Sequence, residues 1–269
     1  MDNGFLIYAS GPDYIKQAYL CGLSIERFNN FPISLVTTDD TYITEKIKNF
    51  FDKIIIVPPD LNYRYHISNR SSLYFLSPYE NTIVFDSDTI ILENFDKKWQ
   101  ELYDQNFIYY PTDAFTYRNV KVTNDFYRKA FVDNNLPNIY TGCYFFKKCN
   151  ESDKFYSLLK IVADNWPEFY KIYLGKDKLN LPSMDILTAI TDKMLKVNSI
   201  KQKSFFKFIH MKNKIQDWKI NANSWLDTIP YYINDDSELF VGNYKQSGVF
   251  HYVINDFCND CIIDTFEKL

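Results

Sequence analysis

The chain has 269 residues, a net charge of −4 at neutral pH, and aromatic side chains at 18% of its positions. This length allows one large α/β domain with a sizeable core. The acidic balance excludes a general affinity for nucleic acid, which needs a basic surface. No apolar run reaches the 18 residues of a membrane span. The first expected strand follows Met1 so closely that we expect no signal peptide. The five scattered cysteines favour reduced thiols in a cytoplasmic protein.

Strands and helices alternate along the first third of the chain. Short apolar runs predict strands, and longer amphipathic stretches predict the helices between them. The turn Ser10-Gly11-Pro12 marks the start of the first helix. We expect strands at 5–9, 33–38, 53–57 and 82–85, and helices at 14–28, 41–51 and 68–76. This alternation predicts a parallel sheet flanked by helices.

The strand expected at 82–85 ends in Asp86-Ser87-Asp88, and a second apolar run follows at 90–92. Open α/β sheets place ligand sites at the carboxyl ends of their strands. Two aspartates at i and i+2 share one face of an extended chain. Their oxygens suit Mn²⁺ or Mg²⁺, which can in turn hold a diphosphate. Asp86 and Asp88 are therefore candidate metal ligands, and a solvated strand end is the alternative.

The rest of the chain alternates less regularly, and a polar stretch at 117–138 has no clear pattern. Apolar runs again predict strands, and a long amphipathic segment interrupted near Pro167 predicts a broken helix. We expect strands at 107–110, 140–146, 205–209 and 249–252, and helices at 99–103, 152–173, from 181 onward and at 255–269.

The segment from Arg70 to Thr89, RSSLYFLSPYENTIVFDSDT, resembles the signature of glycogenin-like (family 8) retaining glycosyltransferases. In that signature a basic helix residue precedes a strand that ends in D-x-D. The resemblance implies an α/β fold of the GT-A type, with a mostly parallel Rossmann-like sheet flanked by helices. It implies one domain over 1–269, with a nucleotide-binding half at 1–95 and a sugar- and acceptor-binding half at 96–269.

The resemblance also implies an activity. The expected reaction moves a sugar from a nucleotide diphosphate sugar, with UDP as the expected nucleotide, to a glycan or other hydroxyl acceptor. Retention of the anomeric configuration and dependence on Mn²⁺ or Mg²⁺ are expected. Asp86 and Asp88 would hold the metal. The positions expected to contact the donor are Ala9, Ser10, Tyr14, Arg70, Ser87 and Lys212.

Two further acids correspond to residues near the donor sugar in that family. Asp113 falls where the family has an acid that contacts the sugar. Asp185 belongs to a partial match to the motif D-Q-D-x-L-N, whose first two residues are Ser183 and Met184 here. Gly142 matches a family glycine, whereas a family asparagine is Tyr140. We expect Asp185 to stabilise an oxocarbenium-like transition state.

The expected third metal ligand is a histidine in the last third of the chain. His210 follows the strand at 205–209 and has Trp218 at the family's eight-residue spacing. Lys212 and Lys214 are nearby and could contact the diphosphate. His251, in the strand at 249–252, is the rival ligand.

Two other functions use the same residues. A haloacid-dehalogenase-type phosphatase would use Asp86 as nucleophile and Asp88 as acid/base, with Asp235-Asp236 as a weak match to its acidic metal motif. A non-catalytic carbohydrate-binding relative would keep the fold without the reaction, and the departures at Ser183 and Met184 keep this alternative open.

Overall fold

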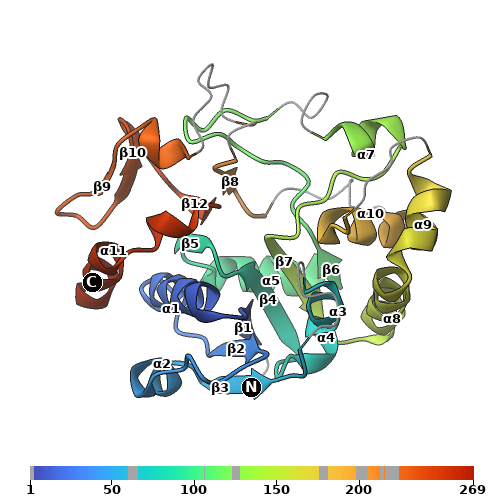
Figure 1. The fold of residues 1–269 in the computed structure, drawn as a ribbon, viewed down its shortest axis with the longest axis horizontal. Helices are drawn as coiled ribbons and strands as arrows, with labels where there is room; N and C mark the ends of the chain where they lie inside the picture. The colour runs from blue at the N-terminus through green and yellow to red at the C-terminus, as the bar shows by residue number, and fades with distance from the viewer. Residues whose placement is uncertain are drawn as a thin grey trace.

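The computed structural model describes residues 3–59, 66–105, 107–122, 128–175, 181–197, 205–212, 215 and 224–269. Its centre is a six-stranded sheet with the order β3-β2-β1-β4-β7-β6 (Figure 1). Strands β1 to β4 run parallel, and β7 is antiparallel to both of its neighbours. The strands are β1 Asn3–Tyr8, β2 Ile33–Thr37, β3 Lys53–Ile56, β4 Asn81–Asp86, β6 Ile108–Tyr109 and β7 Cys143–Lys147. The predicted class, α/β with a mostly parallel central sheet flanked by helices, is confirmed.

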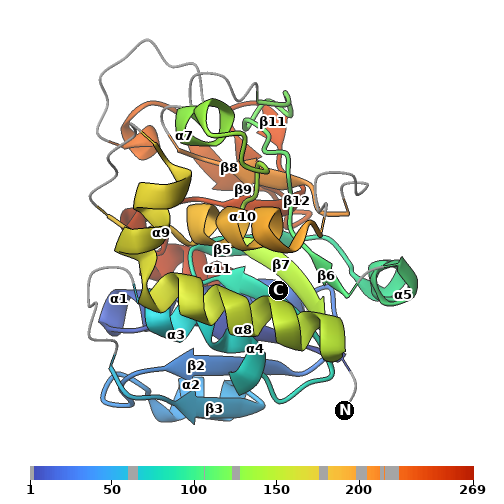
Figure 2. The ribbon, with the colours of Figure 1, turned by 90° about the vertical axis from the view of Figure 1, so that its right-hand side faces the viewer.

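Helices cover both faces of this sheet, because successive side chains of a strand point to opposite faces. In β1, Phe5 and Ile7 belong to a core shared with α1 (Pro12–Glu26) and α5 (Asp96–Gln105). Leu6 and Tyr8 belong to a second core on the other face, shared with the helices that Figure 2 shows in front of the sheet. These are α3 Ile67–Ser71, α4 Leu73–Leu76, α8 Asn150–Asp164 and α10 Met184–Leu195.

Two predicted helices are each divided in two. The helix expected at 68–76 is interrupted at Ser72, between the end of α3 and the start of α4. The helix expected at 152–173 ends as α8 at Asp164, and α9 (Trp166–Tyr173) begins next to Pro167. Proline lacks the amide hydrogen that a continuous helix needs and fits the first turn of a new one, so the predicted interruption is confirmed.

A second, three-stranded sheet has the order β5-β12-β8, and its strand β5 directly follows the D-x-D turn in the sequence. Strand β5 (Thr89–Leu92) pairs antiparallel with β12 (Gly248–His251), which pairs parallel with β8 (Phe208–His210). This pairing sets His251 beside both Thr89 and His210. The C-terminal part of the chain therefore packs directly against the candidate metal site.

The remaining elements lie outside these sheets and include a small antiparallel sheet that the sequence did not predict. It consists of β9 (Tyr231–Ile233), β10 (Leu239–Val241) and β11 (Tyr244–Lys245). The other described α-helices are α2 (Glu45–Phe50), α7 (Lys129–Asp133) and α11 (Asp260–Lys268), and two short 3-10 helices lie at Trp225–Asp227 and Asn255–Phe257. In the part of the chain that the structure describes, no helix is both long and apolar enough to span a bilayer.

Candidate functional site

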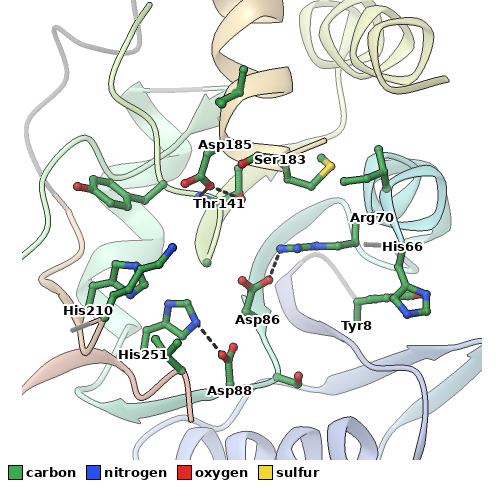
Figure 3. Close-up of a pocket in the computed structure, with 18 of the residues that line it drawn as sticks. Tyr8, His66, Arg70, Asp86, Asp88, Thr141, Ser183, Asp185, His210 and His251 are labelled. Carbon is green, nitrogen blue, oxygen red and sulfur yellow. Dashed lines mark hydrogen bonds and ion pairs between the residues drawn. The ribbon is translucent and has the colours of Figure 1, made fainter. Parts of the chain in front are cut away.

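A cavity of about 790 Å³ opens at the carboxyl ends of β1 and β4 (Figure 3). Tyr8 and Asp86 end these strands at the same level, because they are paired in the parallel register. The wall is completed by α3, by the start of α10, by β8 and β12, and by the segment that enters β7. This volume is typical of a small-molecule site, and its position agrees with the rule for open α/β sheets.

The D-x-D turn is held from both sheets by backbone hydrogen bonds. The amide of Asp86 donates to the carbonyl of Gly142 at 3.0 Å, and the amide of Tyr252 donates to the carbonyl of Asp88 at 3.1 Å. The hydroxyl of Thr89 donates to the carbonyl of Asp86 at 2.7 Å. These bonds hold the backbone of the turn, and both carboxylates point into the cavity (Figure 3).

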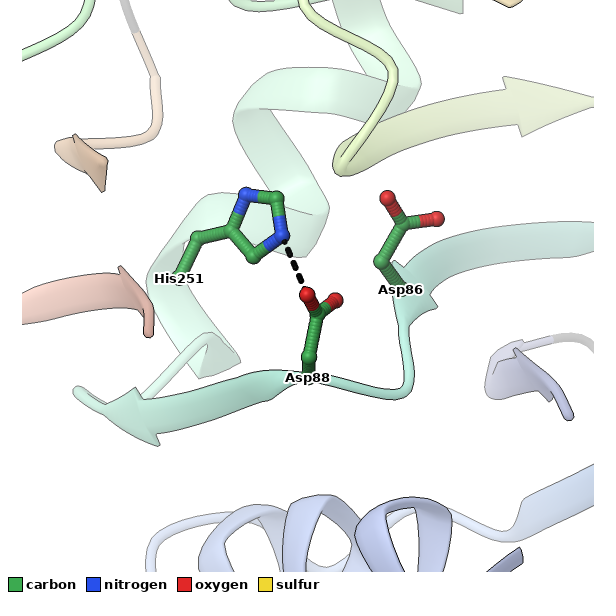
Figure 4. Close-up of side chains that lie close together, drawn as sticks. All are labelled: Asp86, Asp88 and His251. Atoms are coloured by element: carbon green, nitrogen blue, oxygen red, sulfur yellow. Dashed lines mark ion pairs between the residues drawn. The ribbon is translucent and has the colours of Figure 1, made fainter. Parts of the chain in front are cut away.

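Asp86, Asp88 and His251 form a group that can hold a divalent cation (Figure 4). One ligand atom from each residue lies within 4.8 Å of the other two. The Nε2 atom of His251 is 2.9 Å from Oδ2 of Asp88, and its buried Nδ1 has no hydrogen-bond partner among the described residues. Two carboxylates and one imidazole suit Mn²⁺ better than Mg²⁺, which prefers oxygen ligands alone.

The contact between His251 and Asp88 favours the charged form of each group. Burial disfavours the imidazolium, but the Asp88 carboxylate beside it, together with those of Asp86 and Asp185, outweighs this effect and raises the pKa of His251. Burial likewise disfavours the Asp88 carboxylate, but the nearby imidazolium lowers the pKa of Asp88. The contact therefore favours the ionised form of Asp88, which a metal ligand needs, although the side chain is largely buried.

His210, the preferred metal ligand from the sequence, lies behind His251 and outside this group. The two imidazole rings stack with centroids 4.7 Å apart and planes 13° apart. Burial and the charge of His251 hold the pKa of His210 well below its usual value, so the ring is neutral. The geometry favours the rival, His251, because β12 lies between β5 and β8 and His210 is one strand farther from the D-x-D turn. Lys214 and Trp218, which supported His210, lie outside the described residues.

Arg70, the cation that the resemblance implies for donor binding, lies beside Asp86 in the cavity wall. Its Nη2 atom is 2.5 Å from Oδ1 of Asp86, and about a quarter of each side chain is exposed. All the positions expected to contact the donor line the same cavity: Ala9, Ser10, Tyr14, Arg70, Ser87 and Lys212. The structure thus brings together residues from four separate parts of the chain.

Asp185 also faces the cavity, where two neighbours fix its carboxylate. Its Oδ1 accepts hydrogen bonds from the amide and the hydroxyl of Thr141, at 2.9 and 2.7 Å. Its Oδ2 is 2.6 Å from Nη1 of Arg128. The Arg128 guanidinium is in turn held between the rings of Phe131 and Tyr140, at 3.7 and 4.3 Å from their centroids.

Several lining residues escaped the sequence analysis. Arg128 falls in the stretch at 117–138 that showed no pattern, and its role depends on contacts with distant segments. His66 had no sequence context, yet it lines the cavity with its ring centroid 5.7 Å from that of Tyr8. Tyr8 is a third missed residue that lines the cavity. The sequence could have indicated it, because Tyr8 ends β1 and a parallel sheet places the ends of β1 and β4 side by side.

Other expected site residues lie outside the cavity, or line it with a side chain that differs from the family motif. Asp113 pairs with Lys121 at 2.8 Å and is not among the described residues that line the cavity. Ser183 and Met184 do line it, so a hydroxyl and a thioether stand in the wall beside Asp185. Asp235 and Asp236 are exposed between β9 and β10, outside the cavity lining. They therefore do not complete the metal site of a phosphatase built on Asp86.

Comparison with known proteins finds no matching family model and no matching curated sequence. The solved structures that resemble this chain include glycosyltransferases. Mouse xyloside xylosyltransferase 1 is 12% identical over 71% of this chain and 82% of its own, with a TM-score of 0.45. The galactosyltransferase LgtC, in complex with donor and acceptor sugar analogs, is 11% identical over 70% of each chain, with a TM-score of 0.46. GlyE of Streptococcus pneumoniae TIGR4 is 14% identical over 73% of this chain, which spans 44% of GlyE, with a TM-score of 0.42.

Proposed function

We propose that this protein is a metal-dependent glycosyltransferase of the GT-A type, using a nucleotide diphosphate sugar as donor and a hydroxyl group as acceptor. One observation carries the proposal: a single cavity joins the Asp86–Asp88–His251 group to the cations Arg70 and Lys212 at the carboxyl edge of a parallel sheet. A diphosphate needs a cation on one side and basic side chains on the other, and this cavity offers both.

The departing diphosphate is the group that this site would stabilise. Asp86, Asp88 and His251 would hold Mn²⁺, which, when bound, supplies Lewis-acid stabilisation of the leaving group. Arg70 and Lys212 add charge-assisted hydrogen bonds to phosphate oxygens. Such preorganised charges stabilise the transition state without rearranging during the reaction. UDP is the nucleotide that we propose for the donor.

The sugar would lie between the diphosphate site and Asp185. Burial disfavours the Asp185 carboxylate, but Arg128 and Thr141 outweigh this effect and lower its pKa. An ionised carboxylate with a fixed orientation can stabilise the positive charge of an oxocarbenium-like transition state. We propose this role for Asp185, with retention of the anomeric configuration.

A binding screen followed by an activity assay tests the proposal. Isothermal calorimetry with UDP, GDP, ADP and CMP, each with and without Mn²⁺, is expected to show tight binding of UDP, and only with the metal. The matching nucleotide sugar should then be hydrolysed slowly without an acceptor. Metal-dependent phosphate release from small phosphomonoesters, with phosphate trapped on Asp86, would instead identify a phosphatase. Sugar binding without any nucleotide affinity would identify a carbohydrate-binding protein.

A further inference from the structure

The carboxylate of Asp86 has two competing uses. It belongs to the group that can hold a divalent cation, with ligand atoms within 4.8 Å of one another. It is also the partner of Arg70, whose Nη2 atom is 2.5 Å away. A guanidinium at this distance neutralises the charge that attracts a metal ion, and it repels a second cation in the same place. Arg70 and a metal ion therefore oppose each other at Asp86.

The position of Arg70 favours movement of its side chain away from Asp86. It comes from α3, a helix of five residues that begins after the left-handed backbone of His66 and ends at Ser72. Its side chain is 26% exposed and lines the cavity. Among the described residues, Asp86 is the acid with which it pairs. A planar guanidinium with five donors fits a phosphate as well as a carboxylate, so a diphosphate in the cavity offers Arg70 another anion.

We propose that Arg70 makes metal binding depend on the donor. Without donor, its guanidinium stays on Asp86 and weakens the affinity for the cation. The donor diphosphate attracts the guanidinium and releases Asp86 to the metal. This inference rests on the proposed function, because it takes a diphosphate as the ligand of the cavity. Linkage then requires that the metal strengthen diphosphate binding by the same factor.

The test compares Mn²⁺ and UDP affinities in the intact protein and in Arg70→Met. Calorimetry with Mn²⁺ alone is expected to show roughly 10-fold tighter binding to Arg70→Met, because a positive charge beside the metal is removed. With saturating Mn²⁺, the affinity for UDP is expected to fall roughly 10-fold, because charge-assisted bonds to the diphosphate are lost. The two affinities thus change in opposite directions, which a general loss of structure would not cause.

Two further variants serve as controls for this comparison. Arg118→Met removes an arginine that lies on Tyr117 and does not line the cavity, and it should change neither affinity. Arg70→Lys keeps the charge at the site and should retain weak binding of Mn²⁺ alone, even if Arg70→Met folds poorly. If folded Arg70→Met binds Mn²⁺ no more tightly than the intact protein does, the inference is wrong but the proposed function can stand. If neither the intact protein nor any variant binds Mn²⁺, with or without UDP, the proposed function fails as well.

Discussion

Nε2 of His251 lies 2.9 Å from Oδ2 of Asp88, although the two residues are far apart in the sequence. The contact arises because β5, which follows the D-x-D turn, pairs antiparallel with β12, and His251 lies opposite Thr89. Backbone pairing of two strands thus brings the imidazole to the carboxylates. The strand pairing therefore fixes the position of the His251 backbone beside the D-x-D turn.

Replacement of His251 should therefore impair metal binding more than replacement of His210. We expect His251→Ala to weaken Mn²⁺ affinity in the presence of UDP by roughly 10- to 100-fold or more, because the metal loses a direct ligand and loss of an outer-shell partner alone costs about 10- to 100-fold. His210→Ala removes only a ring stacked behind His251, so a smaller effect is expected. Manganese titration followed by electron paramagnetic resonance measures both. A larger loss in His210→Ala would restore His210 as the ligand.

Gly142 should be intolerant of any side chain. A Cβ atom there would come within 2.9 Å of the Phe208 ring and 3.4 Å of Nδ1 of His251. We expect Gly142→Ala to lower the free energy of unfolding by roughly 1–3 kcal/mol, the usual cost of overpacking, and to weaken Mn²⁺ binding through displacement of His251. Urea denaturation measures the first effect. Adding Phe208→Leu, which makes room, should recover part of the stability, and no recovery would argue against this contact as the cause.

The Arg128–Asp185 pair should behave as a unit. Arg128 is 6% exposed, so its removal leaves the Asp185 carboxylate without its cation in a largely buried place. We expect Arg128→Met to cost roughly 3–5 kcal/mol of stability. Adding Asp185→Asn should cost little more, because the uncompensated charge is gone. Chemical denaturation of the two single variants and the double variant gives the coupling energy, and additive costs would show that the two residues act independently.

The same pair should contribute to stability in a pH-dependent way. The pKa of Asp185 is lowered in the folded protein, whereas an unfolded aspartate has a pKa of about 3.9. Between the folded and the unfolded pKa, the unfolded state therefore binds more protons than the folded state. The contribution of Asp185 to the free energy of unfolding is present above about pH 4 and is lost as the pH falls through the folded pKa. Between pH 5 and pH 3, the intact protein should lose more stability than Asp185→Asn. Parallel urea midpoints over this range would contradict the assignment.

Local patterns were enough to predict most of the sheet and the two carboxylates. Strand β4 reads as a short apolar run that ends in Asp86, and its place at the carboxyl edge follows from strand–helix alternation. The basic residue Arg70 is on α3, close enough to this strand in the sequence for the motif to show it. Residues joined by short segments of regular structure are therefore accessible to sequence analysis.

Contacts between distant segments were not accessible in this way. The choice between His210 and His251 depends on the strand order β5-β12-β8, which neither histidine's neighbours in the sequence reveal. Arg128 lies in a stretch without periodicity, and only its contacts with Asp185 and Tyr140 give it a role. Asp113 matched a family position, but its partner is Lys121 and not the cavity.

The central claim is that Asp86 and Asp88 bind a nucleoside diphosphate through a divalent cation, and calorimetry of UDP with Mn²⁺ tests it most directly. The intact protein should bind UDP only when Mn²⁺ is present. Asp88→Asn should weaken this binding by roughly 100-fold or more, since a carboxylate ligand is lost, while cooperative thermal unfolding persists. Equal UDP affinity with and without Mn²⁺, or in Asp88→Asn and the intact protein, would contradict the account.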